Sequence, residues 1–183
     1  MTPNRPAEDL VEALFHQHVN AIYRYCQAQL GEAAGQDVTS QVFMVAWRKA
    51  NSIPQDKARA WLFGVARRLV ANQHRAGKRQ RALIEKAKGI NAGAPLEGDP
   101  AAIVAGADLA RRAIAALGAR DREVLCLVLA EDLTKAELGQ ALGISANAAG
   151  VRLSRARAHL TKSIEKLEQT ETSTLSASKK ADP

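Results

Sequence analysis

The sequence predicts an all-α protein with two small helical domains joined by a flexible linker. Apolar residues recur every three to five positions through most of the chain, the spacing of an amphipathic helix, and no stretch shows the alternation of a half-buried strand. A stretch containing glycine and proline, residues 87–107, interrupts this pattern and offers little apolar surface for burial. These observations predict a domain at 8–86, the linker, a second domain at 108–169 and a disordered tail at 170–183.

Three helices are expected in the first domain, each with an apolar stripe that can pack against the other two. The stripes are Leu10, Leu14, Val19, Ile22, Cys26 and Leu30 in the first helix, Val38, Val42, Val45 and Ala46 in the second, and Ala58, Leu62, Val65 and Leu69 in the third. Between the last two helices, NSIPQDK at residues 51–57 contains Asn, Ser and Pro, which favour turns over helix interiors. We therefore expect a short loop there.

The second domain contains the pattern of a helix-turn-helix. Thr134 can cap a short helix, with Glu137 three residues later as its capping-box partner. Gly143 is suited to end that helix, and Ser145 to cap the next one. Two helices joined by so tight a turn are a layout with which many proteins bind duplex DNA.

The helix after Ser145 is predicted to have one buried and one exposed face. With about 100° between successive residues, the buried stripe is Ala149, Leu153, Ala156 and Leu160. The opposite side carries Asn147, Val151, Ser154, Arg155 and Ala158, flanked by Arg152 and Arg157. Arginine pairs with guanine, asparagine with adenine, and valine contacts the thymine methyl, whereas the flanking arginines suit phosphates. An ordinary bundle helix with a basic face is the alternative, but the preceding turn favours DNA binding.

The positive charge of the chain is concentrated in one segment. With 26 Lys and Arg against 19 Asp and Glu, the net charge is +7 and the isoelectric point about 9.7. Residues 65–90 contain one acid, Glu85, and these cations: Arg67, Arg68, Arg75, Lys78, Arg79, Arg81, Lys86 and Lys88. A charge run is usually a solvated helix face, but acids are normally interspersed in such a face. Their near absence favours a surface for a polyanion, and nucleic acid is the best candidate.

Two tryptophans lie near this basic segment. Exposed aromatic rings can stack on unpaired bases, but aromatic residues at helical spacing more often belong to the core. We therefore expect Trp47 and Trp61 to be mainly buried. The two cysteines, Cys26 and Cys126, each stand alone in an apolar segment and are expected to be buried and reduced.

Several classes of function are disfavoured. No apolar run approaches the roughly 20 residues of a membrane span, and the N-terminus lacks the apolar stretch of a secretion signal, so we expect a cytoplasmic protein without membrane insertion. No catalytic residue, metal site or cofactor is expected. A small nuclease or deaminase would need a metal or an acid–base constellation. The histidines are scattered instead, at His16, His18, His74 and His159.

In the order and spacing of its motifs, the chain resembles the extracytoplasmic-function (ECF) sigma factors of bacterial RNA polymerase, within the sigma-70 superfamily. QDVTSQVFMVAWRKA is similar to the polymerase-binding helix of this family, and ARAWLFGVARRLVANQHR to the promoter-melting helix that follows it. ALGARDREVLCLVLAEDLTKAELGQALGIS and VRLSRARAHL are similar to its fourth region and recognition helix. The resemblance covers residues 10–83 and 109–162. It implies a sigma-two-like bundle followed by a sigma-four-like helix-turn-helix.

The resemblance also implies three sets of binding residues. The set expected to bind the clamp coiled coil of core RNA polymerase is Asp37, Gln41, Trp47 and Arg48. The set expected at the minus-ten element is Asn51, Ser52, Ile53, Gln55, Asp56 and Lys57 of a base-capturing loop, with Trp61, Arg67, Arg68, Asn72 and Arg75 of the next helix. The set expected at the minus-thirty-five element is Asn147, Val151, Arg152, Ser154, Arg155 and Arg157. The implied partners are promoter DNA, the largest and second-largest subunits of core polymerase, and an anti-sigma factor.

The chain departs from the family pattern at two of these places. Gln41 stands where a glutamate is common, which removes a charge from the expected polymerase contact. The family often has a threonine–valine pair and a basic residue where this chain has Ala148, Ala149 and Gly150, which removes a possible phosphate contact. A helix-turn-helix regulator that acts without polymerase is the alternative function. The basic run argues against it, because it lies in the domain that such a regulator would use to dimerise or to sense a ligand.

Overall fold

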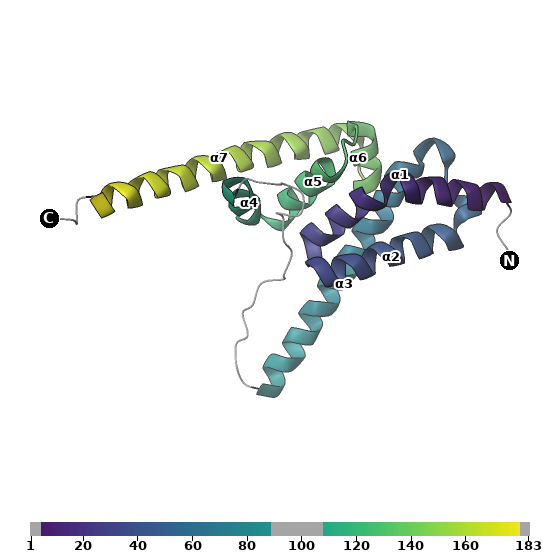
Figure 1. Ribbon diagram of the computed structural model, residues 1–183, viewed down its shortest axis with the longest axis horizontal. Helices are drawn as coiled ribbons and strands as arrows, with labels where there is room; N and C mark the ends of the chain where they lie inside the picture. Colours follow the sequence, from purple (N-terminus) through teal and green to yellow (C-terminus); the bar gives the residue numbers. More distant parts are fainter. Residues whose placement is uncertain (1–4, 89–107, 180–183) are drawn as a thin grey trace.

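The computed structural model describes residues 5–88 and 108–179, which form helices joined by short turns (Figure 1). The α-helices are α1 (Arg5–Leu30), α2 (Glu32–Arg48), α3 (Ala58–Lys88), α4 (Asp108–Ala115), α5 (Ala119–Ala130), α6 (Lys135–Leu142) and α7 (Ala146–Lys179). Two short 3-10 turns, η1 (Ala50–Ser52) and η2 (Gln55–Lys57), connect α2 to α3. No strand occurs in the described ranges, so the all-α prediction is confirmed. The predicted linker at 87–107 lies outside the described residues, except for its first two positions, which end α3.

In the first domain, α1 and α2 form an antiparallel pair against which α3 packs. The predicted stripes supply its core, in which Ile22, Val42 and Leu62 are completely buried. The backbones of α1 and α2 touch at Gly35, where a Cβ atom would lie 2.7 Å from Gln27 Cα. The absence of a side chain at Gly35 therefore permits the close packing of this pair.

The helix-turn-helix of the second domain is confirmed in detail. Thr134 accepts a hydrogen bond from the Glu137 N–H at 3.3 Å, and the Glu137 carboxylate accepts one from the Thr134 N–H at 2.9 Å, which completes the capping box. Gly143 ends α6 in the left-handed region, with φ of 70°. The hydroxyl of Ser145 then accepts a hydrogen bond from the Ala148 N–H at 3.2 Å and caps α7. Local sequence alone thus specifies this motif.

The segment after residue 170 differs from the prediction of a disordered tail. Helix α7 continues to Lys179 and extends away from the rest of the molecule (Figure 1); residues 180–183 lie outside the described part. The segment has few apolar residues, but it also lacks glycine and proline until Pro183. Its threonine hydroxyls donate to carbonyls one turn back, from Thr170 to Lys166 and from Thr172 to Glu168, each at 2.8 Å. Low hydrophobicity therefore did not predict the structure of this segment correctly, because no residue before Pro183 breaks a helix.

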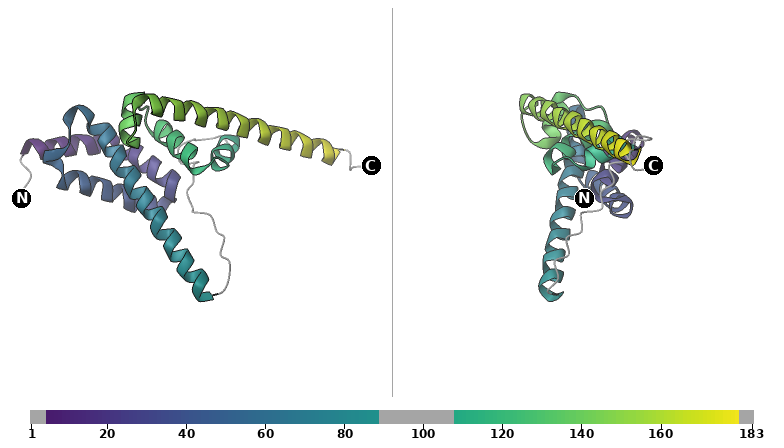
Figure 2. Two further views of the ribbon diagram at one scale, coloured as in Figure 1. Left: turned by 180° about the vertical axis from the view of Figure 1, so that it is seen from behind. Right: turned by 90° about the vertical axis from the view of Figure 1, so that its left-hand side faces the viewer.

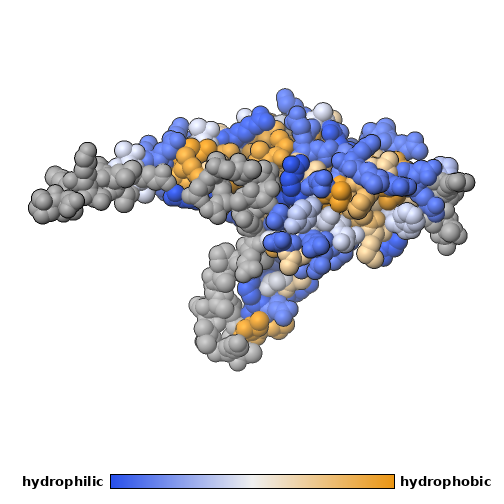
Figure 3. All heavy atoms as spheres, viewed as in Figure 1, coloured by the Kyte–Doolittle hydropathy of each residue, from blue (hydrophilic) through white to orange (hydrophobic). Residues whose placement is uncertain are grey.

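The two domains pack directly on each other, α1 and α3 against α5 and α6, and share one continuous core. At the contact between α3 and α6, a Cβ atom on Gly64 would lie 3.7 Å from Ala141 Cα. The second half of α3 extends away from this body (Figure 2). Near its end, Leu83 and Ile84 are exposed. Figure 3 shows hydrophobic atoms among hydrophilic ones at this end of the helix.

Candidate functional site: protein and nucleic-acid interfaces

The outer face of α2 presents most of the residues predicted to bind polymerase. Asp37, Gln41 and Arg48 are exposed and lie on one side of the helix, because four-, three- and four-residue steps from Asp37 return to the same face. Met44 completes this row and is 59% exposed. Sequence reasoning missed Met44, although its spacing relative to Gln41 and Arg48 could have indicated it. The row combines charged and amide groups with one adaptable apolar side chain.

Trp47 contradicts the expectation of burial, since it is 47% exposed. Its indole lines a pocket of about 270 Å³ between α1 and α2, together with Val11, Glu12, Phe15 and Phe43. Phe15 is itself 43% exposed and packs edge-to-face on Phe43, with ring centroids 4.9 Å apart. Spacing could not reveal this, because helical periodicity does not show whether a neighbouring helix reaches far enough to cover a ring. The exposed indole fits the predicted role in binding a protein partner.

A second pocket, between α2 and α3, has the composition of a site for a nucleotide. It has a volume of about 400 Å³ and is lined by apolar side chains, an indole and two cations: Val45, Val65, Leu69, Trp61, Lys49 and Arg68. Trp61 is half-buried, so that part of its ring faces the pocket. Lys49 and Arg68 are exposed, and neither has an ion-pair partner among the described residues. An apolar wall with an aromatic ring suits an unstacked base, and free cations suit its phosphates.

The loop predicted to capture a base adjoins this pocket, because it begins after Lys49 and ends four residues before Trp61. Five of its predicted contact residues are exposed: Asn51, Ser52, Gln55, Asp56 and Lys57. Ile53 is only 6% exposed, and its side chain belongs to the hydrophobic core. This corrects the expectation that Ile53 contacts DNA, since its side chain anchors the loop instead.

The polar residues of α3 that were predicted to bind DNA divide between two faces. Arg68, Asn72 and Arg75 are exposed, and Arg75 donates a hydrogen bond to the Asn72 side chain. Arg67 points instead to the second domain, where its Nε lies 2.9 Å from Glu123 Oε1. Arg68 therefore lines the α2–α3 pocket, and Asn72 and Arg75 follow it along the same face of α3, whereas Arg67 lies on another face.

On α7, the exposed face agrees with the prediction. The six residues predicted for the minus-thirty-five element are all exposed: Asn147, Val151, Arg152, Ser154, Arg155 and Arg157. Ala149, Leu153 and Ala156 are buried, and Leu160 is partly buried against the core. The first four turns of α7 thus present a polar, basic surface that is supported by α6.

Lys135, at the start of α6, is a candidate contact that sequence reasoning missed. Its Cδ would lie 3.5 Å from a Cβ atom on Gly150, so the lysine stem crosses α7 where the helix has no side chain. Lys135 is exposed and has no ion-pair partner in the described ranges. Its ammonium group therefore supplies positive charge beside Gly150, the position where the family often has a basic residue.

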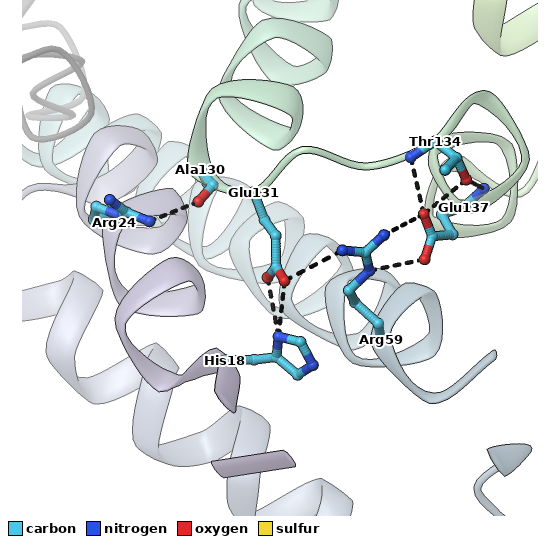
Figure 4. A network of polar contacts seen from close by, with 7 residues as sticks. All are labelled: His18, Arg24, Arg59, Ala130, Glu131, Thr134 and Glu137. Atoms are coloured by element: carbon cyan, nitrogen blue, oxygen red, sulfur yellow. Dashed lines mark hydrogen bonds and ion pairs between the residues drawn. The ribbon is translucent and has the colours of Figure 1, made fainter. Parts of the chain in front are cut away.

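A cluster of ion pairs connects the two domains (Figure 4). We call it the interdomain network; it consists of His18, Arg59 and Arg67 of the first domain and Glu123, Glu131 and Glu137 of the second. The hydrogen bonds from Arg59 lower the pKa of Glu137 to about 2, against the opposing effect of burial. This carboxylate is therefore charged at any physiological pH. The network explains why Arg67 faces away from the other cations of α3.

Both cysteines lie buried in the part of the chain that the structure describes. Burial raises the pKa of both thiols, Cys26 and Cys126, to about 12, so they are protonated at neutral pH. No three His, Cys, Asp or Glu side chains of the described residues are placed to hold a metal ion. None of the described helices is both long and apolar enough to span a membrane.

Comparisons with known proteins match both domains. A family model described as Sigma-70 region 2 matches residues 14–80, and one described as Sigma-70, region 4 matches residues 107–160, together more than half of the chain. The chain is 28% identical over 149 residues to the ECF RNA polymerase sigma factor SigL of Mycobacterium tuberculosis, covering 79% of this chain and 82% of that protein.

Two solved structures share the fold. One is the sigma factor RpoE in complex with the anti-sigma factor NepR from Bartonella quintana, with a TM-score of 0.64 and 19% identity over 84% of this chain and 96% of that one. The other is CnrH in complex with the cytosolic domain of CnrY, with a TM-score of 0.60 and 20% identity over 87% of this chain and 95% of that one.

Proposed function

The chain belongs to the extracytoplasmic-function sigma factors of the sigma-70 family. We propose that it binds core RNA polymerase, recognises the minus-ten and minus-thirty-five elements of a promoter, and helps to separate the two DNA strands. Its site of action would be the cytoplasm, where polymerase and promoter meet. The observation that best supports this proposal is the α2–α3 pocket beside an exposed loop. It combines an indole, an apolar wall and two cations that have no ion-pair partner among the described residues.

Polymerase binding is assigned to the outer face of α2. Asp37 and Arg48 supply opposite charges near the two ends of the row, and Met44 supplies apolar contact area between them. The exposed indole of Trp47 and the adjoining Phe15 extend this surface towards α1. We propose that the clamp coiled coil of the largest subunit packs along this face, because a helical partner can follow a straight row of residues.

Melting is assigned to the α2–α3 pocket and the loop beside it. Extruding one base from duplex DNA costs a few kcal/mol, which stacking and phosphate contacts can offset. We propose that an extruded base of the minus-ten element enters the pocket against Trp61, with its phosphates near Lys49 and Arg68. Asn72 and Arg75 would then contact the adjoining backbone. The loop at 51–57 would close the other side of the base.

Recognition of the minus-thirty-five element is assigned to α7 in the major groove. Asn147, Val151 and Arg155 would contact base edges, because they lie on the side opposite the buried stripe. Lys135 would contact a phosphate on the flank next to α6.

An anti-sigma factor is proposed as a further partner. The two structural neighbours were solved in complex with such a protein or with a cytosolic domain. At their level of identity they support the fold alone, so the partner of this chain is identified only as a class.

The proposal is tested by run-off transcription with purified core polymerase on a pool of genomic fragments. The chain should direct initiation from a subset of fragments that share two sequence elements, and it should co-purify with core polymerase. Binding to duplex DNA without any association with polymerase would instead favour the alternative, a helix-turn-helix regulator.

A further inference from the structure

We propose that the outer end of α3 is a further DNA contact, which binds phosphates of the duplex immediately upstream of the minus-ten element. The contact consists of three exposed residues, Arg79, Leu83 and Lys86, which we call the distal stripe. It rests on the proposed function and extends it from the melted base to the duplex that adjoins it. Leu83 and Lys86 lie beyond residue 80, where the match to Sigma-70 region 2 ends.

The distal stripe continues a row of residues that begins at the α2–α3 pocket. From Arg68, steps of four, three, four, four and three residues lead along α3, and each step returns to the same side of the helix. The row is Arg68, Asn72, Arg75, Arg79, Leu83 and Lys86, and every member is exposed. The row contains no acid, and neither Arg79 nor Lys86 has an ion-pair partner among the described residues.

The more buried side of α3 is the opposite one. Val70 is buried, and His74 and Arg81 are partly buried. With about 100° between successive residues, these three positions lie on the far side of the helix from Asn72 and Arg79. The distal stripe therefore faces solvent, on the part of α3 that extends away from the body of the molecule (Figure 2). A long ligand can approach this side of the helix.

The charge and the length of the row suit the backbone of a duplex. Each helical residue adds about 1.5 Å, so the row runs about 17 Å from Arg75 to Lys86, the length of about five base pairs at about 3.4 Å each. Arginine and lysine at this spacing can pair with phosphates, which position a protein on DNA without reading its sequence. Leu83, 68% exposed, supplies apolar area that can pack on a deoxyribose between the two cations.

The order of the chain favours the upstream side of the melted base. Trp61 and Val65 line the α2–α3 pocket near the start of α3, and the distal stripe lies near its other end. After Lys88 the chain continues through residues 89–107 to the second domain, to which the proposed function assigns the upstream element. The end of α3 that leads to this domain is therefore expected to point upstream.

The pattern of apolar residues favours DNA over a lipid surface. A helix that lies in a membrane interface needs a broad apolar face. The exposed large apolar residues near the end of α3 are Leu83 and Ile84, which are neighbours in sequence and so point about 100° apart. Only Leu83 belongs to the row, where Arg79 and Lys86 flank it.

The test measures binding of the polymerase complex, formed with the full chain, to a promoter obtained by run-off selection. One copy of this promoter carries uncharged methylphosphonate linkages in the five base pairs upstream of the minus-ten element. A control copy carries the same number upstream of the minus-thirty-five element. The distal-stripe variant combines Arg79→Ala with Lys86→Ala. The control variant combines Arg120→Ala with Lys166→Ala, because these exposed cations lie outside the row.

On the unmodified promoter, the distal-stripe variant should bind about 2- to 30-fold more weakly than the wild type, the effect of losing two exposed ion pairs. The slope of log affinity against log salt should fall by about two. Uncharged linkages beside the minus-ten element should weaken binding of the wild type by a similar factor, and binding of the distal-stripe variant no further. The control variant and the control promoter should show no loss.

Two outcomes would overturn this inference alone: equal losses from the uncharged linkages in the wild type and the distal-stripe variant, or no loss in either. Failure of the wild type to bind the unmodified promoter would overturn the proposed function, and the inference with it. The two failures are therefore distinguished by the unmodified promoter.

The lipid alternative is tested by sedimenting the full chain with vesicles of phosphatidylglycerol and phosphatidylcholine. The fraction that sediments should be the same for the wild type and for Leu83→Ser, because the distal stripe is assigned to DNA. A large decrease in Leu83→Ser would show that the distal stripe inserts into lipid and would overturn that assignment.

Discussion

At the scale of single residues, Lys135 and Gly150 form a pair that can be tested by exchange. We expect Lys135→Ala to weaken binding to duplex minus-thirty-five DNA and to reduce the slope of log affinity against log salt by about one. Adding Gly150→Lys to that variant should restore both quantities, since it places an ammonium group at the same flank. Gly150→Ala is the control, because its Cβ has ordinary contacts and alanine favours the helix by about 1 kcal/mol. Unchanged salt dependence in Lys135→Ala would remove this contact from the interface.

Substitutions of two arginines should distinguish contacts to DNA bases from contacts to the DNA backbone. Arg155→Ala on α7 is expected to relax preference at one position of the upstream element, whereas Arg75→Ala on α3 should weaken binding to all promoters and lower salt sensitivity. A library of promoter variants, measured with polymerase at several salt concentrations, distinguishes these outcomes. Equal losses that ignore sequence in both variants would argue against base reading by α7.

The sequence predicted the exposed candidate binding residues only in part. The exposed face of α7 followed from spacing, since burial alternates regularly around a helix that lies on a core. Trp47 and Ile53 did not follow, because exposure of the indole depends on how far α1 extends, and burial of Ile53 depends on how the loop folds back. Lys135 is separated from Gly150 by a turn and was found only through their contact in space.

At the scale of elements, α6 combines a capping box with the interdomain network at one carboxylate. The folded-state pKa of Glu137, about 2, lies below the ordinary value of 4.5. Its contribution to stability is therefore complete above about pH 4.5 and is lost as the pH falls through about 2. Glu137→Gln retains a capping-box side chain but cannot be ionised. Urea unfolding between pH 5 and about 2 should show a shallower loss of stability in this variant; identical pH profiles would show that Glu137 does not contribute.

The α1–α2 pair offers a test of close packing. Gly35→Ala should lower the free energy of unfolding by about 1–3 kcal/mol, because its Cβ would meet backbone atoms of Gln27 that cannot move independently. Gly118→Ala is the matched control, since nothing lies within 4 Å of its added Cβ. Thermal unfolding of both variants measures the difference, and equal melting temperatures would contradict the account of this contact.

Helix ends marked by capping residues were predictable from the sequence. The extent of a helix whose sequence contains no residue that stops it was not. Thr134, Glu137, Gly143 and Ser145 act on neighbouring backbone groups, so their order alone specified where α6 ends and α7 begins. The far end of α7 has few apolar residues, and the sequence indicated disorder. The helix continues there because no residue interrupts its hydrogen bonds.

At the scale of the whole molecule, the packing of the two domains was not predictable. Arg59 and Glu137 are 78 residues apart, and Arg67 and Glu123 are 56 apart. The sequence showed only a basic segment and scattered acids, and ion pairs at such separations depend on the fold that brings them together. The net charge of α3 indicated a polyanion, yet part of that charge is already neutralised within the chain.

In the proposed function, one chain contacts one promoter at two separate places while bound to polymerase. Hydroxyl-radical footprinting of the polymerase complex on a promoter obtained by run-off selection, combined with permanganate probing of unpaired thymines, tests this most directly. We expect two protected segments about 25 base pairs apart, with unpaired thymines only in the downstream one. A single protected segment, or the same footprint without polymerase, would contradict it.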